Sequence, residues 1–260
     1  MGLWRVRIIA GLLAVLAATG CATPVVAPQQ PNTVIIVPGL GGDGGDGGVY
    51  AQIVHGLRDA GSQDCLRIFN WGCSWALFPV TLSSSALHHD TERKLAEQIT
   101  QWRNDHPGCR IVLIGHSAGA GVVVGALGRL DDCTVVGPVI LLAPALSPDF
   151  DLRPALVHAT VVHVFFSPED TFWQGIGSFI FGGYDGIHRD GAGRKGFTLA
   201  QLTAEQKAKV IQHPWQAQWK PLGEDGGHFD WMARPFVTEV LAPLIDHRPD
   251  ANTNATSGRE

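Results

Sequence analysis

The sequence predicts an α/β fold in which helices flank both faces of a mostly parallel sheet. Short runs rich in Val, Ile, Leu and Phe alternate with segments of helical pattern, which is the order that a parallel sheet requires. These runs are nearly continuously apolar, as expected of strands buried on both faces. The chain has 260 residues, of which 45% are hydrophobic, enough for one domain with a sizeable core.

The apolar runs and the segments between them define the expected elements in order. Strands are expected at 33–37, 66–69, 110–115, 138–143 and 160–166. Helices are expected where apolar residues recur at helical spacing, where a segment ends at Gly or Pro-Gly, or where one directly follows a strand. They cover 50–61, 90–108, 118–130, 198–213 and 232–245. The alternation of the two sets along the chain is what predicts the α/β class.

The first 21 residues resemble a bacterial lipoprotein signal peptide. Arg5 and Arg7 precede an apolar run at 8–18, which is too short to span a bilayer comfortably. The run ends in LAATGC, and a small residue before Cys21 resembles the lipoprotein box. The resemblance implies that Cys21 becomes the lipidated first residue of an exported protein anchored to a membrane of the bacterial cell envelope. The alternative is an ordinary secretory peptide that is cut nearby.

The rest of the chain divides into three parts. Residues 22–32 form a Pro-rich tether, 33–247 the α/β domain, and 248–260 a tail of disordered composition. The formal net charge is −5 without a basic cluster, which argues against nucleic acid as a partner.

Apart from Cys21, the chain has four cysteines, and export would allow them to form disulfides. Cys109 and Cys133 are expected to pair, because each lies at the amino end of one of two neighbouring strands. Cys65 and Cys73 flank the second strand and are too far apart to bridge if that strand is extended, so their state stays open.

The stretch RIVLIGHSAG predicts a nucleophilic serine. Gly115, Ser117 and Gly119 make the pattern G-x-S-x-G between a buried strand and a helix. This is the context of a nucleophile elbow, a strained turn that lifts the serine Oγ above the sheet. The N–H of Ala118, at the start of the helix, would face a developing oxyanion. With His116 included, GHSAG resembles the lipase and esterase members of the α/β-hydrolase superfamily.

The glycine-rich stretch PGLGGDGGDGG follows the first expected strand. In the superfamily, the loop after an early strand supplies a second oxyanion N–H, and the resemblance implies Leu40 for this role, although Pro38 replaces the usual His. The same glycines match a dinucleotide-binding pattern, but the next strand ends in Asn70-Trp71 rather than in the required acidic residue. A calcium-binding glycine repeat would need more than one copy.

A nucleophilic serine needs a base and an orienting acid, and the resemblance implies the chain order serine, acid, histidine. His228 lies in a glycine loop before the last expected helix, as the histidine of the superfamily does. Carboxylates at strand carboxyl ends project toward the elbow, and the resemblance implies that the acid follows the strand at 160–166, where Asp170 is the expected residue. The alternatives are Asp149, Asp151 and Glu169.

Together these features predict an exported serine hydrolase that cleaves carboxylic esters, of small molecules or of lipids, through an acyl-enzyme. No metal or organic cofactor is implied. An acyltransferase with the same triad and a non-catalytic binding protein on the same fold are the alternatives. The segment at 172–184 is apolar and glycine-punctuated, which fits a lid, an acyl groove or a buried helix.

Overall fold

The computed structural model describes residues 32–40, 48–71, 81, 84–171 and 183–246. The signal peptide with Cys21, the tether up to residue 31, Cys73, the segment 172–182 and the tail at 248–260 lie outside these ranges. None of the helices within the described ranges is long and apolar enough to cross a bilayer.

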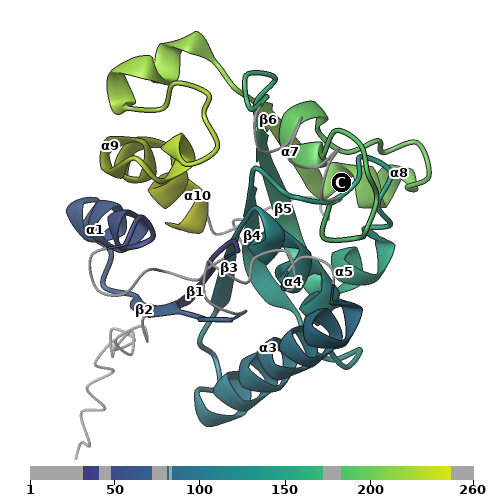
Figure 1. Ribbon diagram of the computed structural model, residues 1–260. Helices are drawn as coiled ribbons and strands as arrows, with labels where there is room; N and C mark the ends of the chain where they lie inside the picture. The colour runs from purple at the N-terminus through teal and green to yellow at the C-terminus, as the bar shows by residue number, and fades with distance from the viewer. Residues whose placement is uncertain (1–31, 41–47, 72–80, 82–83, 172–182, 247–260) are drawn as a thin grey trace, which may run out of the picture.

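Six parallel strands form the sheet at the centre of the molecule (Figure 1). The strand order is β2-β1-β3-β4-β5-β6, and each neighbouring pair is parallel. The predicted α/β class is therefore confirmed. The strands are β1 (Thr33–Val37), β2 (Cys65–Ile68), β3 (Ile111–His116), β4 (Val136–Leu142), β5 (Ala159–Phe166) and β6 (Val210–Pro214).

The helix predicted at 198–213 is wrong. The structure has a short helix α8 (Ala204–Ala208), begun by a capping box at Thr203, and then the edge strand β6. Within the described ranges β6 pairs on one side, with β5, so polar residues are tolerated there and the run lacks the continuous apolar signal of a central strand. Pro214 ends this strand, a position that an edge strand allows.

Helices cover both faces of the sheet (Figure 1). On one face, alternate strand residues such as Ile35 and Val37 pack in a core with α4; on the other, Val34 and Ile36 pack in a core with α1. The first face carries α3 (Ser85–Asp105), α4 (Ala118–Leu127), α5 (Arg153–His158) and α7 (Ala192–Lys195). The second carries α1 (Ala51–Asp59), the 3-10 turns η3 (Ala217–Leu222) and η4 (Asp230–Met232), α9 (Arg234–Phe236), the π-turn η5 (Val237–Leu241) and α10 (Ala242–Asp246).

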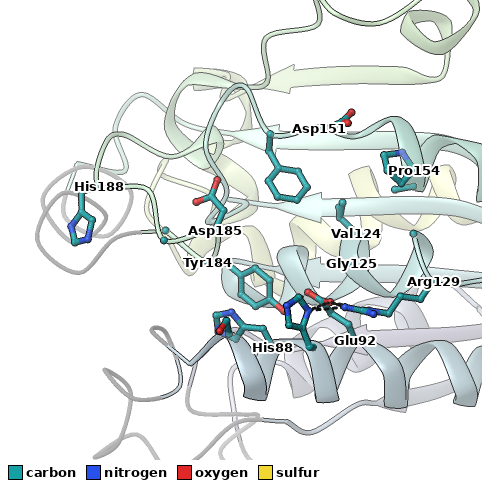
Figure 2. A pocket seen from close by; sticks show the side chains of 17 residues that line it. His88, Glu92, Val124, Gly125, Arg129, Asp151, Pro154, Tyr184, Asp185 and His188 are labelled. Carbon is teal, nitrogen blue, oxygen red and sulfur yellow. Dashed lines mark hydrogen bonds and ion pairs between the residues drawn. The ribbon is translucent and has the colours of Figure 1, made fainter.

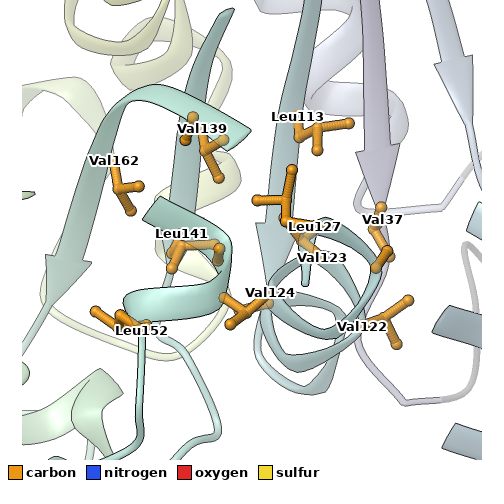
Figure 3. Packing of buried hydrophobic residues seen from close by; sticks show 14 of the residues in the cluster. Val37, Leu113, Val122, Val123, Val124, Leu127, Val139, Leu141, Leu152 and Val162 are labelled. Atoms are coloured by element: carbon orange, nitrogen blue, oxygen red, sulfur yellow. The ribbon is translucent and has the colours of Figure 1, made fainter. Parts of the chain in front are cut away.

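Helix α4 is central to the first core (Figure 3). Its glycines and valines are poor helix formers, so burial rather than intrinsic propensity stabilises it. Val122, Val123 and Leu127 are fully buried against strand residues that include Val37 and Leu113. This packing holds the first turn of α4 at the carboxyl edge of the sheet, where β3 ends.

The predicted disulfide between Cys109 and Cys133 is wrong. The register that pairs Leu113 with Val139 brings Cys109 level with Val135, so Cys133 lies beyond it in an exposed turn. The Cys109 Sγ instead lies 3.6 Å from Thr33 Oγ1, on the side of β1. Cys133 is a free cysteine in the structure, so it is not joined to Cys109.

Candidate active site

Ser117 occupies a strained turn between β3 and α4. Its φ and ψ are 54° and −122°, a conformation that residues with a side chain rarely adopt. The turn is held by hydrogen bonds from Ser117 N–H to Leu142 O at 2.9 Å and from Ala145 N–H to Ser117 O at 3.0 Å. A Cβ on Gly119 would lie 2.3 Å from the carbonyl oxygens of Val37 and Pro38, so this position admits only glycine.

Ser117, His228 and Asp170 lie in hydrogen-bond contact at the carboxyl edge of the sheet. The His228 Nε2 lies 3.0 Å from the Ser117 Oγ, and its Nδ1 lies 2.6 Å from the Asp170 Oδ2. His228 and Asp170 are buried, whereas Ser117 is partly exposed. The arrangement matches a nucleophile, a base and an orienting acid in geometry.

The other carboxylates considered from the sequence point elsewhere. Asp149 forms an exposed ion pair with Arg189, and Asp151 lies 2.8 Å from Arg153. Glu169 is exposed. Asp170, which follows β5, is thus the member of this set that contacts His228.

The expected oxyanion donors are the N–H groups of Ala118 and Leu40. Ala118 is the first residue of α4, so its N–H has no partner within the helix and lies at the positive end of the helix dipole. Leu40 lies in a partly exposed turn after β1. The preceding Gly39 lies directly against the elbow, since a Cβ there would be 3.1 Å from Ser117 Cβ. Residues 41–47, which continue this loop, lie outside the described ranges.

Two residues that the sequence analysis did not select contact this site. The Tyr50 hydroxyl lies 2.7 Å from Gly39 N and 2.8 Å from His116 Nδ1. The Trp71 Nε1 donates to Pro38 O at 2.7 Å. Burial raises the pKa of the Tyr50 hydroxyl and holds the pKa of His116 well below its usual value. The sequence signal that could have identified Tyr50 was its place, as an aromatic residue with a polar group, just after the glycine-rich stretch.

A large cavity of about 770 Å³ lies beside α3 and α4 (Figure 2). Glu92 pairs with Arg129 at 2.7 Å and accepts a hydrogen bond from the Tyr184 hydroxyl at 3.0 Å. Ser117, His228 and Asp170 are not among the described residues that line it. Across the described part of the chain, no three His, Cys, Asp or Glu side chains gather as metal ligands would.

Comparison with known families identifies the chain. Residues 48–218 match the family described as "Alpha/beta hydrolase of unknown function (DUF900)". The chain belongs to this family. The match spans well over half of the hydrolase, including Ser117 and Asp170, and agrees with the parallel sheet. No curated protein matches this α/β hydrolase.

Solved structures similar to this α/β hydrolase share little sequence with it. The ydeN gene product of B. subtilis is 18% identical, with 82% of this chain and 98% of that chain covered and a TM-score of 0.47. A lipase-esterase related protein from Clostridium acetobutylicum is 14% identical, with coverages of 84% and 96% and a TM-score of 0.47. Trichoderma reesei cutinase, bound to a phosphonate inhibitor, is 17% identical, with coverages of 83% and 77% and a TM-score of 0.39.

Proposed function

We propose that this α/β hydrolase is a serine esterase and that Ser117, His228 and Asp170 are its catalytic triad. The observation that carries the proposal is the continuous hydrogen-bond chain from the Ser117 Oγ through both nitrogens of His228 to the Asp170 carboxylate. The strained backbone of Ser117 supports it, because strain of this kind is retained where function requires it.

The proposed reaction has two halves. Ser117 Oγ attacks the ester carbonyl carbon while His228 Nε2 takes the hydroxyl proton, and Asp170 stabilises the resulting imidazolium. The N–H groups of Leu40 and Ala118 donate to the oxyanion. His228 then gives the proton to the departing alcohol, which leaves an acyl-serine. Water attacks this ester in the second half, again through His228, and releases the carboxylic acid.

Removal of the serine hydroxyl tests the proposal. Unaltered protein should react with a fluorophosphonate probe and hydrolyse p-nitrophenyl esters. Ser117→Ala should abolish labelling and lower turnover by about 10⁴-fold or more, with its melting temperature near that of the unaltered protein. Ser147→Ala is the matched control, because the Ser147 hydroxyl donates to Asp185 rather than to a histidine. Unlabelled Ser117 in folded, unaltered protein would instead support a non-catalytic binding protein.

We also propose that the enzyme acts at a membrane of the bacterial cell envelope, to which a lipid on Cys21 anchors it. The lipoprotein-like end of the signal peptide supports this location, and the Pro-rich residues after it would serve as a spacer. The substrate is an ester of a small molecule or a lipid. A chain-length series of p-nitrophenyl esters would define the preferred acyl group.

A further inference from the structure

The Pro38–Gly39 peptide group, just before the proposed oxyanion donor Leu40, is held at both of its polar ends by buried side chains. The Trp71 Nε1–H donates to the Pro38 carbonyl oxygen at 2.7 Å, and the Gly39 N–H donates to the Tyr50 hydroxyl at 2.7 Å. The orientation of this peptide group is therefore determined by two directional hydrogen bonds. The Gly39 N–H is already engaged, which leaves Leu40 as the next N–H along the loop.

Tyr50 connects this peptide group to the histidine loop through His116. The His116 Nδ1 lies 2.8 Å from the Tyr50 hydroxyl, and its Nε2 lies 2.8 Å from the main-chain oxygen of His228. Both side chains are almost fully buried, with exposed fractions of 2% for Tyr50 and 1% for His116. The chain of contacts thus joins the loop after β1, the elbow and the proposed catalytic histidine.

The hydrogen positions in this chain have one consistent assignment. The Gly39 N–H can only donate, so the Tyr50 hydroxyl accepts from it and gives its own hydrogen to His116 Nδ1. The His228 carbonyl oxygen can only accept, so His116 Nε2 carries the imidazole hydrogen. This requires neutral His116 in a single tautomer, and burial of the ring favours the neutral form.

We propose that Tyr50 and His116 are positioning residues that hold the oxyanion loop and the main chain of His228 in place around Ser117. The inference rests on the proposed function. A phenylalanine would fill the space of Tyr50 without the cost of burying a hydroxyl, so packing alone does not account for the polar pair. The hydroxyl adds a directional link between two loops that come from distant parts of the chain.

The test uses Tyr50→Phe, which preserves the ring and removes both hydrogen bonds. Loss of one oxyanion-hole donor costs about 10²- to 10³-fold in kcat. Displacement of the loop should cost less, so we expect kcat to fall by about 10- to 100-fold with KM within about twofold. The kcat value is the rate divided by the concentration of serines that the fluorophosphonate titrates, so misfolded protein does not contribute to it. His116→Gln, which keeps a donor and an acceptor, should retain more kcat than His116→Leu.

His158→Gln is the matched control for the histidine variants. It alters another buried histidine, but one whose Nδ1 lies 2.8 Å from the Thr134 main-chain oxygen rather than in the serine site, and its kcat per titrated serine should equal that of unaltered enzyme. A Tyr50→Phe enzyme with a lower melting temperature but unchanged kcat per titrated serine would overturn the positioning role. If unaltered protein neither labels nor hydrolyses esters, the proposed function itself fails, which is a distinguishable result.

Discussion

The two nitrogens of His228 have different partners, and this difference determines what the ring can do. Its Nδ1 faces the Asp170 carboxylate, which can only accept, so the imidazole hydrogen belongs on Nδ1. The Nε2 lone pair is then available to the Ser117 hydroxyl, 3.0 Å away. The buried carboxylate thereby selects the tautomer in which His228 can act as a base toward Ser117.

Asp170→Asn tests this account of the tautomer. The amide can donate to Nδ1, which favours the tautomer with hydrogen on Nε2 and leaves Ser117 without a base. We expect the fold to be retained and kcat to fall by about 10³- to 10⁴-fold. Steady-state hydrolysis of a p-nitrophenyl ester measures the change. Asp149→Asn, which alters an exposed carboxylate paired with Arg189, is the control and should keep full activity. The opposite pattern in the two variants would contradict the assignment.

At the scale of elements, the loop between η3 and η4 carries His228, and hydrogen bonds to carboxyl groups hold the backbone of this loop. Glu224 in this loop is fully buried, and its Oε1 accepts from Gly226 N–H at 3.1 Å. Its Oε2 has no hydrogen-bond partner within the described ranges. A second carboxyl group also holds this loop, since the Asp230 Oδ2 accepts a hydrogen bond from the Gly227 N–H at 3.0 Å. The loop is therefore shaped by two carboxyl groups close to the histidine.

Burial raises the pKa of Glu224 from 4.5 to about 8, helped by the negative charges of Asp230 and Asp225. A carboxyl group with a raised pKa in the folded state favours folding most when it is protonated in both states, below pH 4.5. This stabilisation is lost progressively as the pH rises from 4.5 to about 8, because over that range the group ionises on unfolding but stays protonated in the folded protein.

Glu224→Gln should remove that dependence. We expect the melting temperature of the variant, relative to unaltered protein, to increase between about pH 5 and pH 8 and to level off above that. Thermal unfolding followed by circular dichroism at several pH values measures it. Glu239→Gln, the same change at an exposed glutamate of η5, should show no such trend. A constant difference between Glu224→Gln and unaltered protein across this range would show that Glu224 does not titrate on unfolding.

At the scale of the whole molecule, the proposed lipid on Cys21 determines where the enzyme acts. Expressed with its signal peptide in a bacterial host, the protein should partition into the detergent phase of a Triton X-114 extract. Cys21→Ser should move it to the aqueous phase or leave it uncleaved. The control is Cys133→Ser, which alters an exposed cysteine of the folded domain and should leave partitioning unchanged. Mass spectrometry of the mature N-terminus without an acyl group would contradict the anchor.

The fold class was predictable because the central strands of a parallel sheet are buried on both faces. That burial imposes continuous apolar runs, which mark β1, β3, β4 and β5 in the sequence. Among the strands that the structure describes, β6 lies at the edge and pairs with β5, so it carries polar residues and its sequence resembled part of a helix. The predicted start of α3 is five positions too late. An acidic residue was the expected start signal, whereas the side chain of Ser84 caps the helix by accepting from Leu87 N–H at 3.3 Å.

The serine elbow is a local structure, so the sequence by itself determined it: small residues must surround Ser117 for the turn to form, and GHSAG supplies them. Only the tertiary structure decided which residues from distant parts of the chain come into contact. Several carboxylates follow the strand ends, and contact with His228 distinguishes Asp170 among them. Strand register separates Cys109 from Cys133, although both precede neighbouring strands. Tyr50 contacts His116 although 66 residues separate them in the sequence, and no local sequence pattern predicts a contact at that separation.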